Sequence, residues 1–484
     1  MKITASKYFP FYIFTISVII ILVAPFLLQD GMFIDGQQYA CVAQNLANGK
    51  GSFWLPIASD TWTMKGSNYF LEHPPLFYYI ESCVFRTFGN SMYSERLFCL
   101  IMVFTNAFLI HKIWELLTKK DPNAQQLSWV PVLLWISIPI CTWAFRNNMI
   151  EILMSVFTLL SVLFVLKSLL TQQGRIIYLV ISGLFILAAF LTKGLPGLFP
   201  LLCIPLYYLT TKCITLKQMV LYTTITILAP LLLYLFIIYS SKDAFESMNF
   251  YIHERLLNRI NSSPTTNFRF SILLDLCTEL LTPILITLFV LFLMRKKIKP
   301  FNLSVKDKQY ALFFLLIGLF GSLPLMATMV QKSFYFVASL PYFALAFAFI
   351  CYPYIQQGFD SYLNKKQQIS KIKQIFFFFL VFSIIISLLQ IGKCSRDTDK
   401  LADIKYIGDF LKNEKNEKIV CANTDAYYDW SFQIYLYRKY AISLDPNNTK
   451  RSYLITKSNI PNDQLKYYQK IELPLTLYKL YKLK

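Results

Sequence analysis

The sequence predicts an α-helical polytopic membrane protein with a small α/β domain at its C-terminal end. Of the 484 residues, 56% are hydrophobic and only 15% are charged, which makes the chain more apolar and less charged than a soluble domain. The apolar residues gather in repeated runs close to the ~20 residues that cross a hydrocarbon core. After residue 391 the composition changes, and short apolar stretches alternate with Asp, Asn and Pro.

The apolar runs predict about eleven transmembrane helices, at residues 8–28, 92–117, 127–145, 150–171, 176–191, 195–210, 218–240, 272–294, 309–330, 333–355 and 374–391. We interpret the first run as a retained anchor, because no small-residue cleavage site follows it. The fifth and sixth runs are short and meet at LTKGLPG, so they fit either two spans or one broken pair. The run from Pro74 to Phe88 is too short to cross, and we expect a helix at the membrane interface.

The lysines and arginines predict which side of the membrane each connection faces. With the N-terminus inside, the even-numbered connections carry most of the basic residues, including a cluster between 295 and 308. By the positive-inside rule these connections are cytoplasmic. The loops 29–91 and 241–271 then lie outside, and the chain divides into a membrane domain at 1–391 and an external soluble domain at 392–484.

Reporter fusions test this topology. Fusions at Lys418, in the external domain, and at Ser263, in the second long outer loop, are both expected to report an external location, because the lysine bias requires an odd number of crossings. A cytoplasmic signal from either position would contradict the topology and distribute the candidate residues described below over two faces of the membrane.

The tail is expected to form a small α/β domain. Short strands are predicted at Lys418–Ala422, Ala441–Leu444 and Ser452–Thr456, where β-branched and aromatic residues are bounded by Asp, Asn and Pro. Its lysine and tyrosine content fits contact with lipid headgroups or a polymer, and a purely structural lid fits equally well.

Several function classes are not supported by the sequence. The formal net charge is +20, but the basic residues flank apolar runs instead of forming one stripe on a folded module, so nucleic acid is not the expected partner. The ten cysteines include no CxxC pair, so neither a disulfide framework nor a zinc knuckle is indicated. The chain has no Walker loop and no Gly-rich dinucleotide turn after a strand, so a soluble nucleotide donor is not supported.

The predicted topology gathers ionisable residues at the outer rim of the membrane. Charged side chains at or within spans are costly and usually have a partner or a function, so a cluster of them on one face indicates a site. The residues placed there are Asp35, Glu72, His73, Arg146, Glu151, Lys193, His253, Glu254, Arg259 and Lys332.

Two carboxylates are candidates for acid–base chemistry at this rim. Asp35 follows the first span by about one turn, where a carboxylate can act as general base on an acceptor hydroxyl. Glu151, at the start of a later span, is the second candidate. Each has a structural alternative, because Asp35 would also cap a helix that starts at Gly36 and Glu151 would also stabilise a helix N-terminus.

The cations are candidates for phosphate binding. Lys193 and Lys332 lie in very short outer turns, and together with Arg146 and Arg259 they favour a phosphate site, although a single lysine there more often extends to the headgroups. A lipid-linked phosphate donor fits this placement. Glu72 and His73 are of the types that bind a divalent metal ion, but two candidate ligands are too few to define a site.

Six segments in order resemble a known family. They are DGQQYACVAQNLANG, YFLEHPPLFYYI, FGNSMYSERLFCLI, FRNNMIEILMSVFTLL, AFLTKGLPGLFPLL and QKSFYFVASLPYFAL. They are similar to the aminoarabinose transferase and protein O-mannosyltransferase superfamily of polyprenyl-phosphate-sugar-dependent glycosyltransferases, which has the GT-C fold. The similarity covers most of residues 1–355, whereas the tail matches only in kind.

The resemblance implies roles for the residues of the first loop. Asp35 matches the catalytic base, or the group that activates the acceptor, in a single displacement that inverts the anomeric centre. Glu72 matches the acidic residue of an FEKPP-like motif, where some members bind a divalent metal. His73 replaces the usual lysine of that motif, which weakens any transfer of a phosphate-binding role to this position.

The resemblance also covers the later candidates. Glu151 matches a second acidic position, and Lys193 matches the lysine of a KG motif. Lys332 and Tyr335 match a late basic and aromatic pair. In HERLLNRI, Glu254 and Arg259 resemble acidic and basic residues of the family's long outer loop, and His253 precedes them.

We therefore expect an integral-membrane glycosyltransferase that moves a sugar from an undecaprenyl-phosphate type carrier to a lipid, glycan or protein acceptor. The expected location is the cytoplasmic (inner) membrane of a bacterium, with the site facing the periplasm and a role in modifying lipid A or another cell-envelope glycan. Two alternatives stay open: a flippase for lipid-linked glycans, and a polymerase or ligase that uses a lipid-pyrophosphate donor. Charged residues in the middle of several spans would favour a transporter, but here they crowd one interface.

Overall fold

The computed structural model divides the chain into two compact units. The membrane unit comprises Met1–Pro25 and Cys99–Gln390, and the loop–tail unit comprises Phe26–Phe98 and Ile391–Lys484. The structure describes residues 7–63, 67–258, 264–294, 303–362, 366–414, 417–446, 451–458 and 467–484. Arg259 and the reporter position Ser263 lie outside these ranges, as does much of the basic cluster between 295 and 308.

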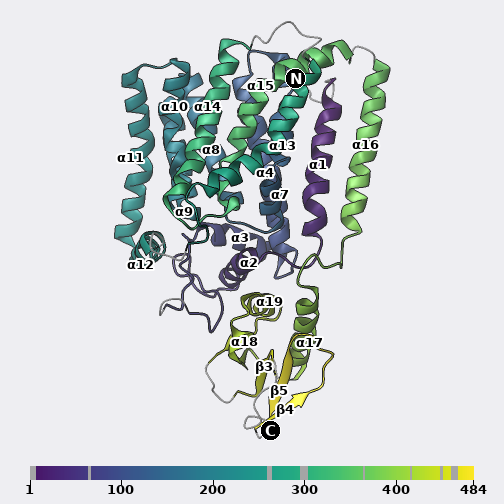
Figure 1. Cartoon of the computed structure of the whole chain (residues 1–484). Coiled ribbons are helices and arrows are strands. Elements are labelled where there is room, and N and C mark those ends of the chain that lie inside the picture. The colour runs from purple at the N-terminus through teal and green to yellow at the C-terminus, as the bar shows by residue number, and fades with distance from the viewer. Residues whose placement is uncertain are drawn as a thin grey trace. The chain divides into compact units, whose positions relative to one another are not determined.

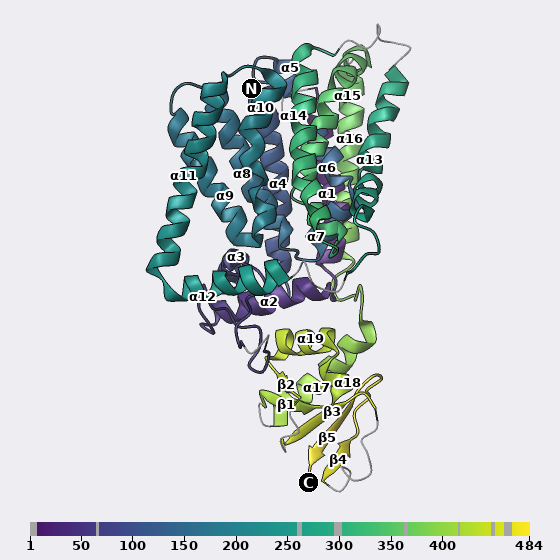
Figure 2. The ribbon, with the colours of Figure 1, turned by 60° about the vertical axis from the view of Figure 1, so that its left-hand side comes forward.

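The membrane unit is built almost entirely of helices that run alongside one another in both views of the ribbon (Figure 1, Figure 2). In chain order they are α1 (Phe9–Leu27), α4 (Ser94–Leu117), α5 (Pro122–Gln125), α6 (Trp129–Ile136), α7 (Pro139–Arg146), α8 (Glu151–Leu170), α9 (Arg175–Lys193), η2 (Leu195–Leu202), α10 (Cys203–Thr211), α11 (Leu216–Ser240), α12 (Lys242–Phe250), η3 (Tyr251–Leu257), α13 (Ser271–Met294), α14 (Val305–Ser322), η5 (Leu323–Ala327), η6 (Ser333–Phe336), α15 (Leu340–Tyr362) and α16 (Lys366–Leu388).

The protein is a multi-pass integral membrane protein. Within the described residues, eight helices are long and apolar enough to cross a membrane, or up to nine if one bent pair counts as a span. The expected number was eleven. The residues of the two remaining expected spans are also largely helical: 195–210 forms the short helices η2 and α10, and 333–355 forms the turn η6 followed by α15.

The bent pair interrupts the expected span at 127–145. Helices α6 and α7 meet at an angle of 78°. Pro139 is the first residue of α7, where its fixed φ favours starting a new helix. The carboxylate of Glu279, on α13, accepts a hydrogen bond of 2.8 Å from the backbone N–H of Ile140 and so satisfies one free donor of the new helix.

Helix α8 is the central element of the membrane unit. In its apolar stretch 72% is buried, against 6% in α16, whose Phe378 is exposed in the way expected of a lipid-facing helix. Helices α8 and α9 pack closely through small residues, since the hydroxyls of Ser161 and Ser182 lie 2.9 Å apart. The ends of these two helices therefore have well-defined positions.

The loop–tail unit combines helices with one mixed sheet. Its elements are α2 (Ile34–Ala47), α3 (Leu76–Phe88), α17 (Thr398–Glu414), β1 (Ile419–Ala422), α18 (Thr424–Tyr427), α19 (Trp430–Tyr440), β2 (Ser443–Asp445), β3 (Tyr453–Thr456), β4 (Tyr468–Ile471) and β5 (Lys479–Leu483). The strand order is β2-β1-β3-β5-β4, with β1 parallel to β2 and β3, and β5 antiparallel to β3 and β4.

The expected α/β tail is confirmed, with two strands more than the sequence predicted. Strands β1, β2 and β3 match the three expected ones to within a few residues. Strand β4 lies at the edge of the sheet, where Gln469 and Lys470 are exposed, so it lacks the apolar run that marks a buried strand. The interfacial helix expected after Pro74 is also present, as α3.

The first loop and the tail form one unit because α19 packs on α2. The hydroxyl of Tyr435 accepts a hydrogen bond from Met32 N–H (3.0 Å) and donates one to Met32 C=O (2.6 Å). The hydroxyl of Tyr437 donates to Asn45 Oδ1 at 2.8 Å. Residues 26–98 thus belong to the same compact unit as the tail. The expected boundary between residues 391 and 392, which separates the membrane domain from the external domain, stays a prediction about topology.

Candidate active site

The centre of the candidate site in the membrane unit is a buried ion pair. Glu151 is the first residue of α8 and Lys193 is the last residue of α9, and the close packing of these helices brings the two ends together. The ammonium of Lys193 donates a hydrogen bond to Glu151 Oε1. Glu151 is 0% exposed and Lys193 is 6% exposed, so both charges are removed from water.

Aromatic rings enclose the ammonium. Lys193 Nζ lies 4.6 Å from the ring centroid of Tyr335 and 5.8 Å from that of Phe334, both in η6, distances at which a ring attracts a cation. The ring of Trp143, on α7, stacks on Phe334 with centroids 5.6 Å apart. Side chains from α7, α8, α9 and η6 therefore meet around Lys193.

A buried pair of this kind is not explained by stability alone. Taking two charges out of water costs several kcal/mol per ion, and replacing such a pair by apolar residues is often neutral or stabilising. In the part of the chain that the structure describes, Glu151 Oε2 has no hydrogen-bond partner, which adds a further cost. A cation held at a span end in spite of these costs is a candidate for ligand binding.

The local structure explains why the KG motif has a glycine at position 194. Gly194 has φ +85°, and a Cβ there would overlap the hydroxyl of Tyr251. That hydroxyl donates a hydrogen bond of 3.1 Å to the backbone carbonyl of Lys193. Gly194 thus permits the close approach of Tyr251 that holds the end of α9 and the ammonium it carries.

Replacing Gly194 by alanine should therefore disturb the site. In Gly194→Ala the positive φ and the overlap with Tyr251 are expected to cost about 1–3 kcal/mol and to displace Lys193. Gly174→Ala is the matched control, since Gly174 has φ +73° but its nearest atoms would lie 3.6 Å from a Cβ. Thermal melting should show a loss of stability in both variants, whereas the transfer rate should fall in Gly194→Ala alone. Equal transfer rates in the two variants would contradict the role of Gly194 in positioning Lys193.

Two other candidate cations of the membrane unit, Arg146 and Lys332, lie next to elements that form this centre. Arg146, one turn after Trp143 on α7, is half-buried and donates from Nε to the backbone carbonyl of Leu22 at 2.6 Å. It lines an open pocket of about 490 Å³ that includes Trp143 and Glu279. Lys332 is exposed and immediately precedes η6, two residues before Phe334.

The residues of the second long loop are placed in part. His253 is exposed, and Glu254 is half-buried and accepts a hydrogen bond of 3.0 Å from the Asn258 side chain. Both lie on η3, which begins at Tyr251, the residue that contacts Lys193. Arg259 lies outside the described residues, so its expected role stays a prediction.

In the loop–tail unit, Asp35 lies inside α2 and is not its cap. The helix begins at Ile34 with Phe33 at the N-cap position, so the alternative of a cap for a helix starting at Gly36 is wrong. Asp35 is half-buried in the first turn, where a carboxylate also interacts favourably with the helix dipole. Its role as a base is untested by this placement.

His73 approaches the same helix. Its ring centroid lies 6.1 Å from that of Tyr39 in an edge-to-face contact. Tyr39 is four residues after Asp35, so the two project from neighbouring positions on α2, and Glu72 is adjacent in the chain to His73. Of the three first-loop candidates, Asp35 thus lies on α2 and His73 contacts the same helix. Within the described ranges no group of three or more His, Cys, Asp or Glu is arranged to hold a metal ion, so the pair Glu72 and His73 stays a prediction.

A second ion-pair network, which the sequence did not reveal, holds this unit together. Buried Arg438, on α19, donates to Glu95 Oε2 at 2.7 Å, and Arg96 donates to Glu95 Oε1 at 2.9 Å. Lys439 pairs with Asp30; burial opposes ionisation of Asp30, but Lys439, the Gly31 N–H and Arg96 outweigh it and hold its pKa below the ordinary value. The only sequence feature that could have indicated this network is the adjacent Glu and Arg in SERL, at the start of a span.

Comparison with known protein families gives a match to the central segment of the chain. Residues 72–239 match the family described as dolichyl-phosphate-mannose-protein mannosyltransferase. This segment contains the first-loop pair Glu72 and His73 as well as Arg146, Glu151 and Lys193. The resemblance expected from the sequence motifs is thereby confirmed. No curated protein matches the chain.

Solved structures share the fold over nearly the whole chain. ArnT from Cupriavidus metallidurans bound to undecaprenyl phosphate matches with a TM-score of 0.66 and 12% identity over 97% of each chain. Its apo state gives a TM-score of 0.61 with the same identity and coverage. AglB, the oligosaccharyltransferase of Archaeoglobus fulgidus in complex with an inhibitory peptide and a dolichol-phosphate, matches with a TM-score of 0.50 and 11% identity over 95% of this chain and 70% of that chain. The expected GT-C fold is confirmed.

Proposed function

We propose a sugar-transfer reaction for this chain, which over residues 72–239 matches the dolichyl-phosphate-mannose-protein mannosyltransferase family and as a whole has the ArnT-like GT-C fold. The protein is a glycosyltransferase that takes a sugar from a polyprenyl-phosphate carrier and passes it to a lipid, glycan or protein acceptor. Its location is the inner membrane of a bacterium, with the site facing the periplasm.

The observation that carries this proposal is the cluster of cations at helix ends of the membrane unit. Lys193 is buried beside Tyr335, Lys332 precedes the same turn η6, and Arg146 lies one turn after the ring that stacks on Phe334. Cations held near membrane helices suit a donor whose phosphate is attached to a lipid. The largely apolar pocket beside Arg146 is consistent with an isoprenoid chain next to that phosphate.

In the reaction, Asp35 accepts the proton of the acceptor hydroxyl while the oxygen attacks the anomeric carbon. The bond from that carbon to the carrier phosphate breaks, so the configuration inverts and polyprenyl phosphate leaves. Lys332, Arg146 and Arg259 neutralise the departing phosphate, since fixed cations stabilise the charge that develops there. Lys193 and Tyr335 contribute from the buried side, and Glu151 holds the Lys193 ammonium in place.

The remaining candidates have supporting roles in this proposal. His253 and Glu254 line the entrance to the site from η3. The same element holds Lys193 in place through the hydrogen bond of Tyr251 to the Lys193 carbonyl. Glu72 and His73 are two adjacent candidate ligands for a divalent metal, and no step of the reaction is derived through a metal. A role in decorating lipid A or another envelope glycan follows from the proposed periplasmic site.

Lys332 provides a direct test of donor binding. Because Lys332 is exposed, Lys332→Ala should leave the fold intact, yet donor affinity should fall about 10-fold with loss of one charge-assisted contact to phosphate. Lys217→Ala, at another exposed lysine of the membrane unit, is the control. Donor affinity, measured in detergent with the lipid-linked donor, should be lower for Lys332→Ala than for Lys217→Ala. Equal affinities would mean that Lys332 acts only as a topology signal.

The cellular function is testable without knowing the sugar. Mass spectrometry of lipid-linked sugars and surface glycans, in cells with and without the gene, should find an accumulating carrier and a missing decoration in the deletion strain. Unchanged pools of both would contradict a glycosyltransferase that uses a polyprenyl-phosphate sugar. An accumulating lipid-pyrophosphate glycan would instead favour a polymerase or ligase.

A further inference from the structure

The residues that lead into α2 are held by the tail through backbone hydrogen bonds. The N–H of Asp30 donates to the Lys393 carbonyl at 2.8 Å, and the Asp30 carbonyl accepts from the Ser395 N–H at 2.9 Å. The hydroxyl of Ser395 also donates to the carbonyls of Asp30, at 3.0 Å, and Gly31, at 3.2 Å. Asp30 and Cys394 are thus paired like neighbouring residues of a parallel sheet.

The local sequence permits this close approach. Gly31 has φ +84°, and a Cβ there would lie 2.6 Å from the backbone oxygen of Arg396. The side chain of Asp30 pairs with Lys439, on α19, so a second segment of the tail contacts the same residue. Residues 30 and 31 are therefore fixed against two segments of the tail.

The hydroxyl of Tyr435 continues this contact at the next residue. It accepts from the N–H of Met32 at 3.0 Å and donates to the C=O of Met32 at 2.6 Å. Tyr435 is 1% exposed and Met32 is 2% exposed, so loss of the hydroxyl would leave two backbone groups buried without this partner. Met32 precedes Asp35, the candidate base, by only three residues.

The first turn of α2, which carries Asp35, needs such support. The helix has 14 residues, a length at which an isolated helix is only marginally stable in water. Phe33 occupies the N-cap position, and its side chain has no oxygen to accept from the N–H groups of the first turn. The position of the Asp35 carboxylate therefore depends on what holds the residues before it.

The far end of α2 is held differently. The hydroxyl of Tyr437 donates to Asn45 Oδ1 at 2.8 Å. The amide of Asn45 also donates to the carbonyls of Ile57, at 2.9 Å, and Ala58, at 3.1 Å, both in the first loop itself. Asn45 is ten residues after Asp35, about 15 Å along the helix. Loss of the Tyr437 hydroxyl should therefore leave the first turn in place.

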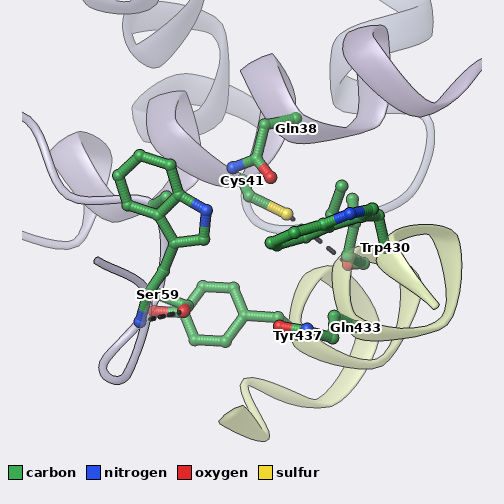
Figure 3. A pocket seen from close by; sticks show the side chains of 9 residues that line it. Gln38, Cys41, Ser59, Trp430, Gln433 and Tyr437 are labelled. Atoms are coloured by element: carbon green, nitrogen blue, oxygen red, sulfur yellow. Dashed lines mark hydrogen bonds between the residues drawn. The ribbon is translucent and has the colours of Figure 1, made fainter. Parts of the chain in front are cut away.

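Between its two ends α2 packs closely on α19. Figure 3 shows Gln38 and Cys41 of α2 facing Gln433 and Tyr437 of α19. The thiol of Cys41 donates to the Ile434 carbonyl at 3.6 Å. The cavity left beside these residues measures about 20 Å³, little more than one water molecule needs. The helix that carries Asp35 thus has little room to shift against the tail.

We propose that Tyr435 is a positioning residue for the candidate base, and that the tail is a scaffold for the loop that carries Asp35. By holding residues 30–32, the tail fixes the start of α2 and with it the Asp35 carboxylate. Such precision is relevant to catalysis, since a misplacement of about 1 Å can cost 10²-fold in rate. The role of Asp35 rests on the proposed transferase function, whereas the hold of the tail on residues 30–32 does not.

Hydrogen exchange tests this hold without any substrate. It is recorded by mass spectrometry on the full-length protein in lipid nanodiscs. Tyr435→Phe removes only the hydroxyl, so exchange of residues 32–37 should accelerate about tenfold. Tyr437→Phe is the matched control, because Tyr437 is 3% exposed, lies on the same α19 and bonds to the same α2. It should leave exchange of residues 32–37 unchanged.

Ser395→Ala is a second, milder variant, since it removes one hydroxyl from the contact with Asp30 and Gly31. Exchange of residues 32–37 should accelerate severalfold in this variant. Thermal melting should show that all three variants are folded. The proposed hold is overturned if folded Tyr435→Phe and Ser395→Ala both exchange this segment as the unmodified protein does.

Transfer rates test the positioning role. The donor is the lipid-linked sugar that accumulates in the deletion strain, and envelopes of that strain supply the acceptor. In Tyr435→Phe the rate at saturating donor should fall about tenfold with the KM for the donor unchanged, whereas Tyr437→Phe should transfer normally. In an Asp35→Asn background, Tyr435→Phe should cause no further loss, because residues that act as a unit are not additive.

The outcomes separate this proposal from the proposed function. A normal rate in folded Tyr435→Phe, or a tenfold loss that persists in the Asp35→Asn background, would overturn the positioning role while the transferase function stands. If the unmodified protein consumes no lipid-linked sugar, the transferase function fails, and hydrogen exchange alone decides whether the tail holds the start of α2.

Discussion

Asp35→Asn is expected to lower the transfer rate by about 10²–10⁴-fold while donor binding persists. The amide keeps the size and hydrogen-bonding ability of the side chain but cannot accept the proton of the attacking hydroxyl, and general bases contribute rate factors of this order. The alternative role, a first-turn carboxylate that interacts with the dipole of α2, contributes only about 0.3–1 kcal/mol to stability and nothing specific to turnover.

Thermal stability, donor binding and transfer rate should be measured side by side on purified protein. Asp409→Asn is a suitable control, because Asp409 is exposed in the same unit and accepts a hydrogen bond of 2.9 Å from Tyr440, which an asparagine oxygen can replace. It should transfer sugar at the normal rate. Near-normal transfer by a stable Asp35→Asn variant would exclude the catalytic role and direct attention to Glu151.

The second large effect concerns the pair of Glu151 and Lys193. Either single change, Glu151→Gln or Lys193→Met, should destabilise the membrane unit by about 3–5 kcal/mol, because it leaves the other charge buried without a counter-ion. Transfer should fall in both variants, although the loss of stability alone would not reveal whether the ammonium takes part in binding the donor.

The double variant Glu151→Gln with Lys193→Met separates these contributions. Removing both charges should restore much of the stability, since a buried pair is often no more stable than an apolar replacement. Transfer should remain low, because the cation beside Tyr335 is absent. Lys167→Met, near the other end of α8, controls for loss of a lysine from the same helix. A double variant that regains normal transfer would show that the pair has only a structural function.

Local patterns were sufficient for much of the fold. The apolar runs predicted the long helices because a membrane span requires a continuous stretch of about 20 apolar residues. Three of the five strands of the tail were predicted from their β-branched and aromatic residues. The polar edge strand β4 was missed because its exposed residues carry no such pattern. The break before Pro139 was missed because Glu279, far along the chain, satisfies the backbone there.

The candidate site shows the same division. Glu151 and Lys193 were selected from the sequence by residue type and by position at predicted span ends, and Tyr335 was selected by the resemblance of its segment to the family. Their direct contact was not predictable, since Glu151 and Lys193 are 42 residues apart and meet only through the packing of α8 on α9. The brace of Tyr251 on Lys193 had no local signal that distinguished it from ordinary polar residues. The adjacent Glu and Arg in SERL were a local signal for the network around Glu95, but they did not reveal that Arg438 completes it.

The sequence by itself thus determined the membrane class, the helices and strands with strong local periodicity, and the residue types available for chemistry. It did so because hydrophobic periodicity and backbone preferences act over a few residues. Only the tertiary structure decided which of those residues meet, as Tyr435 does with Met32 across 403 positions of the chain. Such contacts depend on how helices pack, and packing is a property of several distant segments together, which no single stretch of sequence records.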